Sequence, residues 1–179
     1  MIIEKTPIKD LLLISPKVHY DDRGYFMESY NKSILDEYLN ISFVQDNESL
    51  SQKNVLRGLH FQKPPFAQAK LVRAITGSLF DVAVDLRKNS PTYGQHFKHI
   101  LSSKNKTQLF IPQGFAHGFL CLEDNTIFSY KCSNYYHKES EGSIIWNDKN
   151  LGINWEIENP ILAEKDKSAE NFLTFDNPF

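Results

Sequence analysis

Asn54-Val55-Leu56-Arg57-Gly58-Leu59-His60-Phe61-Gln62 is the stretch on which the interpretation of this chain depends. Its β-branched, aliphatic and aromatic residues are typical of a half-buried strand. A charged arginine, a glycine and a histidine interrupt that apolar pattern. Strict alternation would place His60 on one face and Arg57 on the other, whereas a bulge at Gly58 would turn both side chains toward one cavity. For this strand alone, a core histidine beside a surface arginine is the simpler interpretation.

The length and composition of the chain are those of an ordinary globular protein. Of its 179 residues, 41% are hydrophobic and 23% are charged, so we expect a single domain over residues 1–179 with a sizeable core. The net charge is -2. Because no basic excess is available to match phosphates, we expect no nucleic-acid partner.

Two further features indicate a cytoplasmic protein. No apolar run is long enough to span a bilayer, and the start of the chain lacks the pattern of a signal peptide, so we expect no membrane association. Cys121 and Cys132 lie in apolar runs without metal-binding or redox spacing. We expect them to be buried free thiols in a reducing compartment, and the sequence leaves a disulfide between them open.

Short strand-like runs follow one another along most of the chain, with turn residues between them. There are about ten such runs, among them residues 70–75, 78–86 and 126–132. One short helix is expected over residues 33–39, with Ser33 as its N-cap. Because strands do not alternate with helices, the pattern predicts an antiparallel sandwich or a small barrel.

The run 78–86 alternates cleanly between two faces. Phe80, Val82 and Val84 fall on one face, while Asp81 and Asp85 fall on the other among small or apolar neighbours. Carboxylates in such a place either pair with structural partners or belong to a functional site. For Asp81 the two interpretations are equally compatible with the sequence.

Three segments together resemble one family. They are the His60 strand, the turn Pro112-Gln113-Gly114-Phe115-Ala116-His117-Gly118-Phe119, and Trp146-Asn147-Asp148. They resemble the dTDP-4-dehydrorhamnose 3,5-epimerases, cupin-type enzymes of rhamnose biosynthesis, and the similarity runs nearly the whole chain. The resemblance implies a mainly β fold, a cupin-type double-stranded β-helix or jelly-roll barrel with a few short helices. It also implies a nucleotide-sugar substrate, no cofactor, and a homodimer that exchanges N-terminal strands.

The resemblance also assigns catalytic roles to individual residues. His60 matches the general base, Asp166 the carboxylate that orients it, and Tyr130 the opposing acid. Lys70 and His117 match residues around the substrate carbonyl.

The resemblance assigns further residues to substrate binding. Asp81 backs His117. Arg23 matches a residue that reaches the nucleotide in the partner subunit's site, with Glu28 close by, and Tyr136 matches an aromatic that stacks on thymine. Ala69 departs from the family, which often has glycine there. The remaining matches to ligand contacts are Gln45, Asp46, Asn47, Arg57, Glu141 and Lys165.

These residue types suit the chemistry that the resemblance implies. Epimerisation beside a ketone removes a carbon-bound proton from one face and returns one to the other, here at C3 and C5 of a 4-keto sugar. A histidine titrates near neutrality, and a carboxylate such as Asp166 would fix its tautomer. A phenol such as Tyr130 can donate the returning proton. Taken singly, however, Tyr130 is explained as a core tyrosine, Lys70 as a strand-edge lysine and Asp166 as a helix cap.

Other functions stay open from the sequence. Metal-binding cupins carry a His-x-His pair, but here His60 is followed by Phe61 and Gln62. The positive charge of Lys70 would also repel a bound metal cation. We therefore expect a metal-free site. A C3-only epimerase, or a ketoisomerase of a related nucleotide-linked sugar, would use a similar residue set. A non-catalytic sugar-binding cupin would not need both an oriented histidine and an opposed tyrosine.

Overall fold

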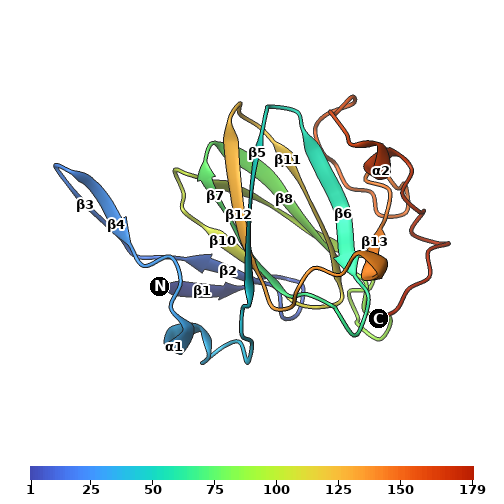
Figure 1. The fold of residues 1–179 in the computed structure, drawn as a ribbon, viewed down its shortest axis with the longest axis horizontal. Coiled ribbons are helices and arrows are strands. Elements are labelled where there is room, and N and C mark those ends of the chain that lie inside the picture. The colour runs from blue at the N-terminus through green and yellow to red at the C-terminus, as the bar shows by residue number, and fades with distance from the viewer.

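Two antiparallel sheets face each other in the computed structural model, which describes residues 1–179 (Figure 1). The six-stranded sheet has the order β1 (Ile2–Lys5), β2 (Leu12–Ser15), β10 (Gln108–Ile111), β7 (Lys70–Thr76), β12 (Thr126–Cys132) and β5 (Gln45–Ser51). The five-stranded sheet has the order β13 (Glu141–Ser143), β6 (Leu56–Gln62), β11 (Phe115–Cys121), β8 (Ser78–Asp85) and β9 (His96–Ser102). The expected mainly β, cupin-type jelly roll is confirmed.

The remaining elements are short and peripheral. A hairpin of β3 (Val18–Asp21) and β4 (Gly24–Met27) stands away from both sheets (Figure 1). The helical turns are α1 (Lys32–Leu35), the 3-10 turn η1 (Lys138–Ser140) and α2 (Glu164–Lys167). None of the helices has the length and apolar content needed to cross a membrane.

The expected N-cap of the first helix was wrong. The helix begins at Lys32, before Ser33, and Asn31 caps it. Asn31 Oδ1 accepts hydrogen bonds from the Ser33 and Ile34 amides at 3.0 and 3.4 Å. Asn31 can do this because its backbone is extended, which aims its short side chain at the otherwise unpaired amides of the first turn.

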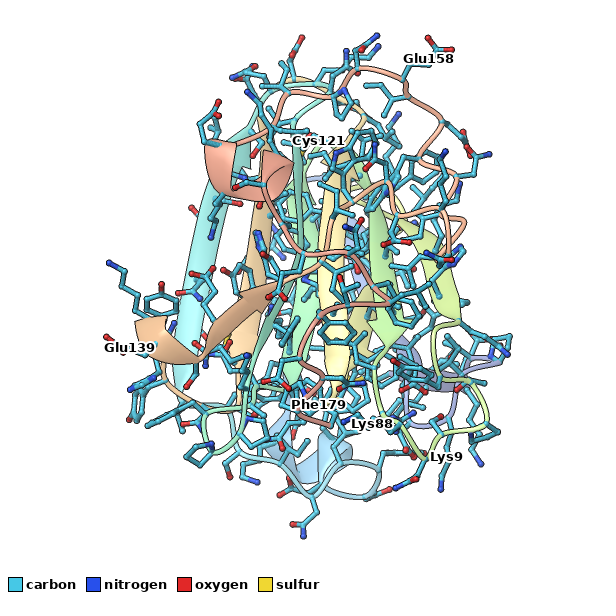
Figure 2. All side chains as sticks on the ribbon, turned by 90° about the vertical axis from the view of Figure 1, so that its right-hand side faces the viewer. Lys9, Lys88, Cys121, Glu139, Glu158 and Phe179 are labelled. Carbon is cyan, nitrogen blue, oxygen red and sulfur yellow. The ribbon has the colours of Figure 1, made fainter.

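Apolar side chains fill three layers. One cluster, with Val72, Leu79 and Phe128, lies between the sheets. A second, with Phe80 and Trp155, lies on the outer face of the five-stranded sheet, under the C-terminal segment that Figure 2 shows crossing that face as far as Phe179. The third packs α1 onto the outer face of the six-stranded sheet. The two faces predicted for the run 78–86 are thus confirmed.

Of the two arrangements that the sequence left open for this strand, the structure has the bulge at Gly58. Arg57 pairs with Phe119 and His60 pairs with His117, so two residues of β6 oppose the single Gly118 of β11. This extra residue changes the alternation of the strand. As a result, Arg57 and His60 both line the same cavity.

Gly58→Ala is expected to destabilise the fold by about 3 kcal/mol, through backbone strain and overpacking. Gly58 has a φ of +130°, and an added Cβ would lie 2.5 Å from Gly118 Cα. Gly24 provides the matched control, since it has the same φ of +130° but no atom within 4 Å of such a Cβ. Urea unfolding of both variants measures the difference. Equal losses would show that close packing of β6 on β11 contributes nothing.

Candidate active site

A cavity of about 680 Å³ opens between the two sheets. One wall comes from β6 and β11 of the five-stranded sheet, and the other from β5, β7 and β12 of the six-stranded sheet. Phe119 and Phe128 supply apolar surface. Twelve side chains proposed from the sequence line this cavity: Gln45, Asp46, Asn47, Arg57, His60, Lys70, His117, Tyr130, Tyr136, Glu141, Lys165 and Asp166.

His60 and Asp166 form a hydrogen-bonded pair on the wall of the five-stranded sheet. His60 Nε2 lies 2.5 Å from Asp166 Oδ1, and the Asp166 side chain is only 1% exposed. Asp166 does not cap α2, whose N-cap is Ala163. A hydrogen bond donated from Nε2 to the carboxylate leaves Nδ1 of His60 as the nitrogen that can accept a proton.

Tyr130 lies on β12, in the opposite wall. Burial raises the pKa of Tyr130 above its ordinary value, while the neighbouring Asn47 side chain lowers it to a smaller extent. The phenol therefore keeps its proton at neutral pH and can donate it. Because His60 and Tyr130 come from different sheets, a ring placed between them would meet a base on one face and an acid on the other.

Lys70 lies beside Tyr130, with Nζ 5.8 Å from the centre of the tyrosine ring. Desolvation lowers the pKa of Lys70 below its ordinary value, and attraction from Cys132, Asp81 and Glu141 offsets this only in part. A desolvated ammonium without a contacting carboxylate is a strong electrostatic partner for an anion that develops nearby.

His117 and Asp81 form a second, more deeply buried pair. His117 Nε2 lies 2.9 Å from Asp81 Oδ2, and the two side chains are 7% and 0% exposed. Burial lowers the pKa of His117 more than Asp81 raises it, and Lys70 and His60 lower it further. The imidazole is therefore neutral at neutral pH. Asp81 stands behind His117 rather than in the cavity wall, as expected.

Four further polar side chains that line the cavity are less buried than the two histidine–aspartate pairs. Glu141 accepts hydrogen bonds from Lys165 Nζ at 2.6 Å and from the Tyr136 hydroxyl at 3.1 Å. The Tyr136 side chain is largely exposed. Arg57 bonds only to the hydroxyl of Ser51, at 3.2 Å. Its guanidinium therefore has donors left for an anionic ligand.

Arg23 and Glu28 do not reach the cavity of their own chain. Arg23 is at the tip of the β3–β4 hairpin, with its side chain 90% exposed and bonded to Asp21. Glu28 follows β4 and accepts a hydrogen bond from Asn31. Exposed Tyr20 and Phe26 accompany them on the hairpin, which stands away from the body of the molecule (Figure 1).

Sequence reasoning missed several residues that line the cavity. They are Glu48, Ser49, Phe61, Gln62, Gln68, Phe119, Phe128 and Ala163. Alternation offered a signal for two of them, since Ser49 follows Asn47 and Gln62 follows His60 at a spacing of two. The aromatic residues gave none, because a phenylalanine that lines a cavity has the same pattern as one in a core.

The two cysteines form no disulfide, and the chain has no cluster of metal-binding side chains. Cys121 and Cys132 are buried free thiols, as expected, and burial raises the pKa of Cys121 to about 11. No group of three His, Cys, Asp or Glu side chains converges in a geometry that could hold a metal ion. The metal-free site stays a prediction, which elemental analysis of the purified protein tests.

Comparison with known proteins identifies the family of this chain. A family model described as dTDP-4-dehydrorhamnose 3,5-epimerase matches residues 5–173. The chain belongs to this family. A family member from Salmonella typhimurium is 54% identical over 172 residues, which cover 94% of each chain. The Elizabethkingia anophelis epimerase superposes with a TM-score of 0.94 at 50% identity, covering 99% of this chain and 98% of that one.

A third family member was solved with a bound sugar nucleotide. It is the dTDP-6-deoxy-D-glucose-3,5-epimerase of Legionella pneumophila, in complex with dTDP-4-keto-L-rhamnose. It superposes with a TM-score of 0.94 at 47% identity, covering 98% of this chain and 94% of that one. The fold that holds the cavity in this chain is therefore the fold that holds a dTDP-sugar in that relative.

Proposed function

We propose that this chain is a dTDP-4-dehydrorhamnose 3,5-epimerase. It converts dTDP-4-dehydro-6-deoxy-D-glucose to dTDP-4-dehydro-L-rhamnose without a cofactor, as a single domain over residues 1–179, and so supplies rhamnose for cell-surface polysaccharides. One observation carries the proposal. His60 on one sheet, paired with Asp166 of α2, faces the protonated Tyr130 on the other sheet, across a cavity large enough for a sugar nucleotide.

In this reaction His60 Nδ1 removes the proton from the carbon next to the ketone. The electron pair of the broken C–H bond moves to the carbonyl oxygen and gives an enolate. The Lys70 ammonium stabilises that oxygen, a contribution of about 3 kcal/mol for a well-placed donor. Tyr130 returns a proton to the opposite face of the same carbon, and both side chains then exchange protons with solvent. The sequence of events occurs once at C3 and once at C5.

Charge and aromatic surface suit the nucleotide half of the substrate. Arg57 has free guanidinium donors for the pyrophosphate, to which a forked cation binds well. Tyr136 presents an exposed ring at the mouth, where thymine would stack. Lys165 and Glu141 pair with each other in the lining of the same cavity.

The active unit in this proposal is a homodimer. The β3–β4 hairpin carries Arg23 and exposed aromatic residues away from its own cavity, so it is well placed to reach another molecule. Arg23 and Glu28 would then complete the partner subunit's site with a cation for the nucleotide and a carboxylate close by.

Arg23→Ala is expected to weaken dTDP binding about thirtyfold, because hydrogen bonds to charged groups contribute roughly 1.5–3 kcal/mol. Proton exchange at saturating substrate should change little. Lys17→Ala, which removes another exposed cation next to the same hairpin, serves as the control. Calorimetric titration with dTDP measures the affinities. An Arg23 variant with unchanged affinity would rule out the shared site.

Mixing variants tests the shared site directly. A hybrid of one Arg23→Ala chain and one His60→Ala chain has one site with both residues intact. Epimerisation at low substrate concentration should therefore appear on mixing, although neither parent variant shows it. No gain after subunit exchange would mean that Arg23 does not act across subunits.

The proposed reaction is tested by incubating the protein with dTDP-4-dehydro-6-deoxy-D-glucose in D₂O and following the sugar by NMR. Deuterium at both C3 and C5 is the expected result. Label at C3 alone would indicate a C3 epimerase or a ketoisomerase, which the final position of the carbonyl distinguishes. No label with intact dTDP binding would indicate a binding protein or another sugar.

A further inference from the structure

Gln62 is a buried carboxamide in the cavity wall, two residues beyond His60 on β6, and it is only 6% exposed. Its Nε2 donates to the Phe66 carbonyl at 2.7 Å and to the Tyr135 carbonyl at 3.1 Å. Its Oε1 accepts from the His137 amide at 2.8 Å. Both amide protons and the oxygen are therefore used, and all three bonds go to backbone groups.

The bonds of Gln62 bracket Tyr136 on both sides. One goes to the residue before it and one to the residue after it, while the Tyr136 amide itself donates to Gln45 Oε1 at 3.0 Å. The segment from 133 to 137 has no helix or strand of its own. Side chains of the neighbouring strands therefore hold its backbone in place of a regular hydrogen-bond ladder.

Gln62 also joins this segment to the loop before β7. The imidazole of His137 stacks on the Phe66 ring, with centroids 3.8 Å apart and planes 3° apart, and Gln62 bonds the backbone of both residues. The Tyr136 ring, in contrast, is 56% exposed, and its hydroxyl is tethered only to Glu141. The backbone beneath the ring is thus fixed, while the ring face stays open.

We propose that Gln62 is a positioning residue for nucleotide recognition: its carboxamide fixes the backbone around Tyr136 and so preorganises that ring as a platform for the nucleobase. The inference rests on the proposed function, in which Tyr136 stacks on thymine. A platform ordered before binding costs less entropy when the base arrives. Gln62 would affect affinity for the base without touching the reacting carbons.

Gln62→Met tests the inference, because methionine keeps the length of the side chain and removes both donors and the acceptor. Calorimetry with dTDP and with inorganic pyrophosphate separates the base from the phosphates. We expect dTDP affinity to fall about tenfold, the scale of one base–aromatic stack, and pyrophosphate affinity to stay within about twofold. The loss should appear in KM, with kcat little changed. Gln62→Glu, which keeps the acceptor for the His137 amide but loses the donors, should shift dTDP affinity in the same direction.

Two controls separate positioning from a general structural role. Asn177 is also buried, at 9% exposure, and makes the same kind of bonds, with Nδ2 to the Leu86 carbonyl at 2.8 Å and Oδ1 to the Phe179 amide at 2.9 Å. Asn177→Leu should lower the unfolding free energy and leave dTDP affinity unchanged. In a Tyr136→Ala background, Gln62→Met should cause no further loss of dTDP affinity, because its effect passes through that ring.

Equal losses of dTDP and pyrophosphate affinity, or additive losses in the Tyr136→Ala background, would overturn the inference. So would unchanged dTDP affinity in both Gln62 variants. These outcomes are distinct from failure of the proposed reaction, which is absence of deuterium exchange by the wild-type protein while it still binds dTDP.

Discussion

His60→Ala is expected to abolish deuterium incorporation at both C3 and C5, with a loss of at least about 10³-fold, in the upper part of the range for a positioned acid or base. The two carbons should fail together, because the proposed reaction assigns both proton abstractions to the same imidazole, that of His60. Affinity for dTDP should stay near that of the wild type, since the nucleotide contacts proposed for Arg57 and Tyr136 lie elsewhere. NMR of the sugar in D₂O measures the first effect and calorimetry the second.

Asp166→Asn tests whether the carboxylate beside His60 supports its role as the base. The amide preserves the shape of the side chain but does not stabilise the imidazolium that forms when His60 takes a proton. Activity should fall less than in His60→Ala, and Asp166→Asn should add little to His60→Ala, because the two residues act as one unit. His96→Ala, on β9 of the same sheet but outside the cavity, should exchange deuterium normally. Normal exchange by folded His60→Ala would contradict the assignment of the base.

Tyr130→Phe is expected to separate exchange from inversion. His60 can still remove a proton and return a deuteron to the same face, so label should enter the sugar at a substantial rate. Net epimerisation needs a proton from the opposite wall and should fall by about 10²-fold or more. The ratio of epimerised to labelled sugar, followed by NMR, is the decisive quantity.

Tyr135→Phe is the matched control for that experiment. Tyr135 is 63% exposed and does not line the cavity, so removal of its hydroxyl should leave the ratio of inversion to exchange unchanged. If Tyr130→Phe lowered exchange and inversion by the same factor, the phenol would serve in forming the enolate instead of in reprotonating it. The roles of the two walls would then have to be reassigned.

Local sequence patterns predicted a large part of the fold. Alternation assigned Phe80 and Asp81 to opposite faces of one strand. The glycine in β6 left open the bulge that turns Arg57 and His60 into one cavity, but did not decide it. The alternation was predicted correctly because pleating depends on neighbouring residues alone, whereas a glycine permits a bulge without requiring one. The cap of the first helix failed because Asn31 and Ser33 are both good caps, and the backbone at the helix start decides between them.

The site depended on the tertiary structure to a much greater extent. His60 and Asp166 are 106 residues apart, and nothing local to Asp166 distinguishes it from a helix cap. The resemblance of the chain to a family predicted that the two residues act together. The packing of α2 against β6 places their side chains 2.5 Å apart. The opposition of His60 and Tyr130 likewise exists only because two different sheets form the two walls.

By itself, then, the sequence determined the β architecture through local patterns, and its resemblance to a family identified most of the residues that line the cavity. Only the tertiary structure decided which polar groups meet. It pairs Asp81 with His117, bonds Gln62 to the backbone around Tyr136, and leaves Arg23 far from its own cavity. The physical reason is that a hydrogen bond or ion pair needs atoms within about 3 Å, and long-range packing alone sets distances between strands that are remote in sequence.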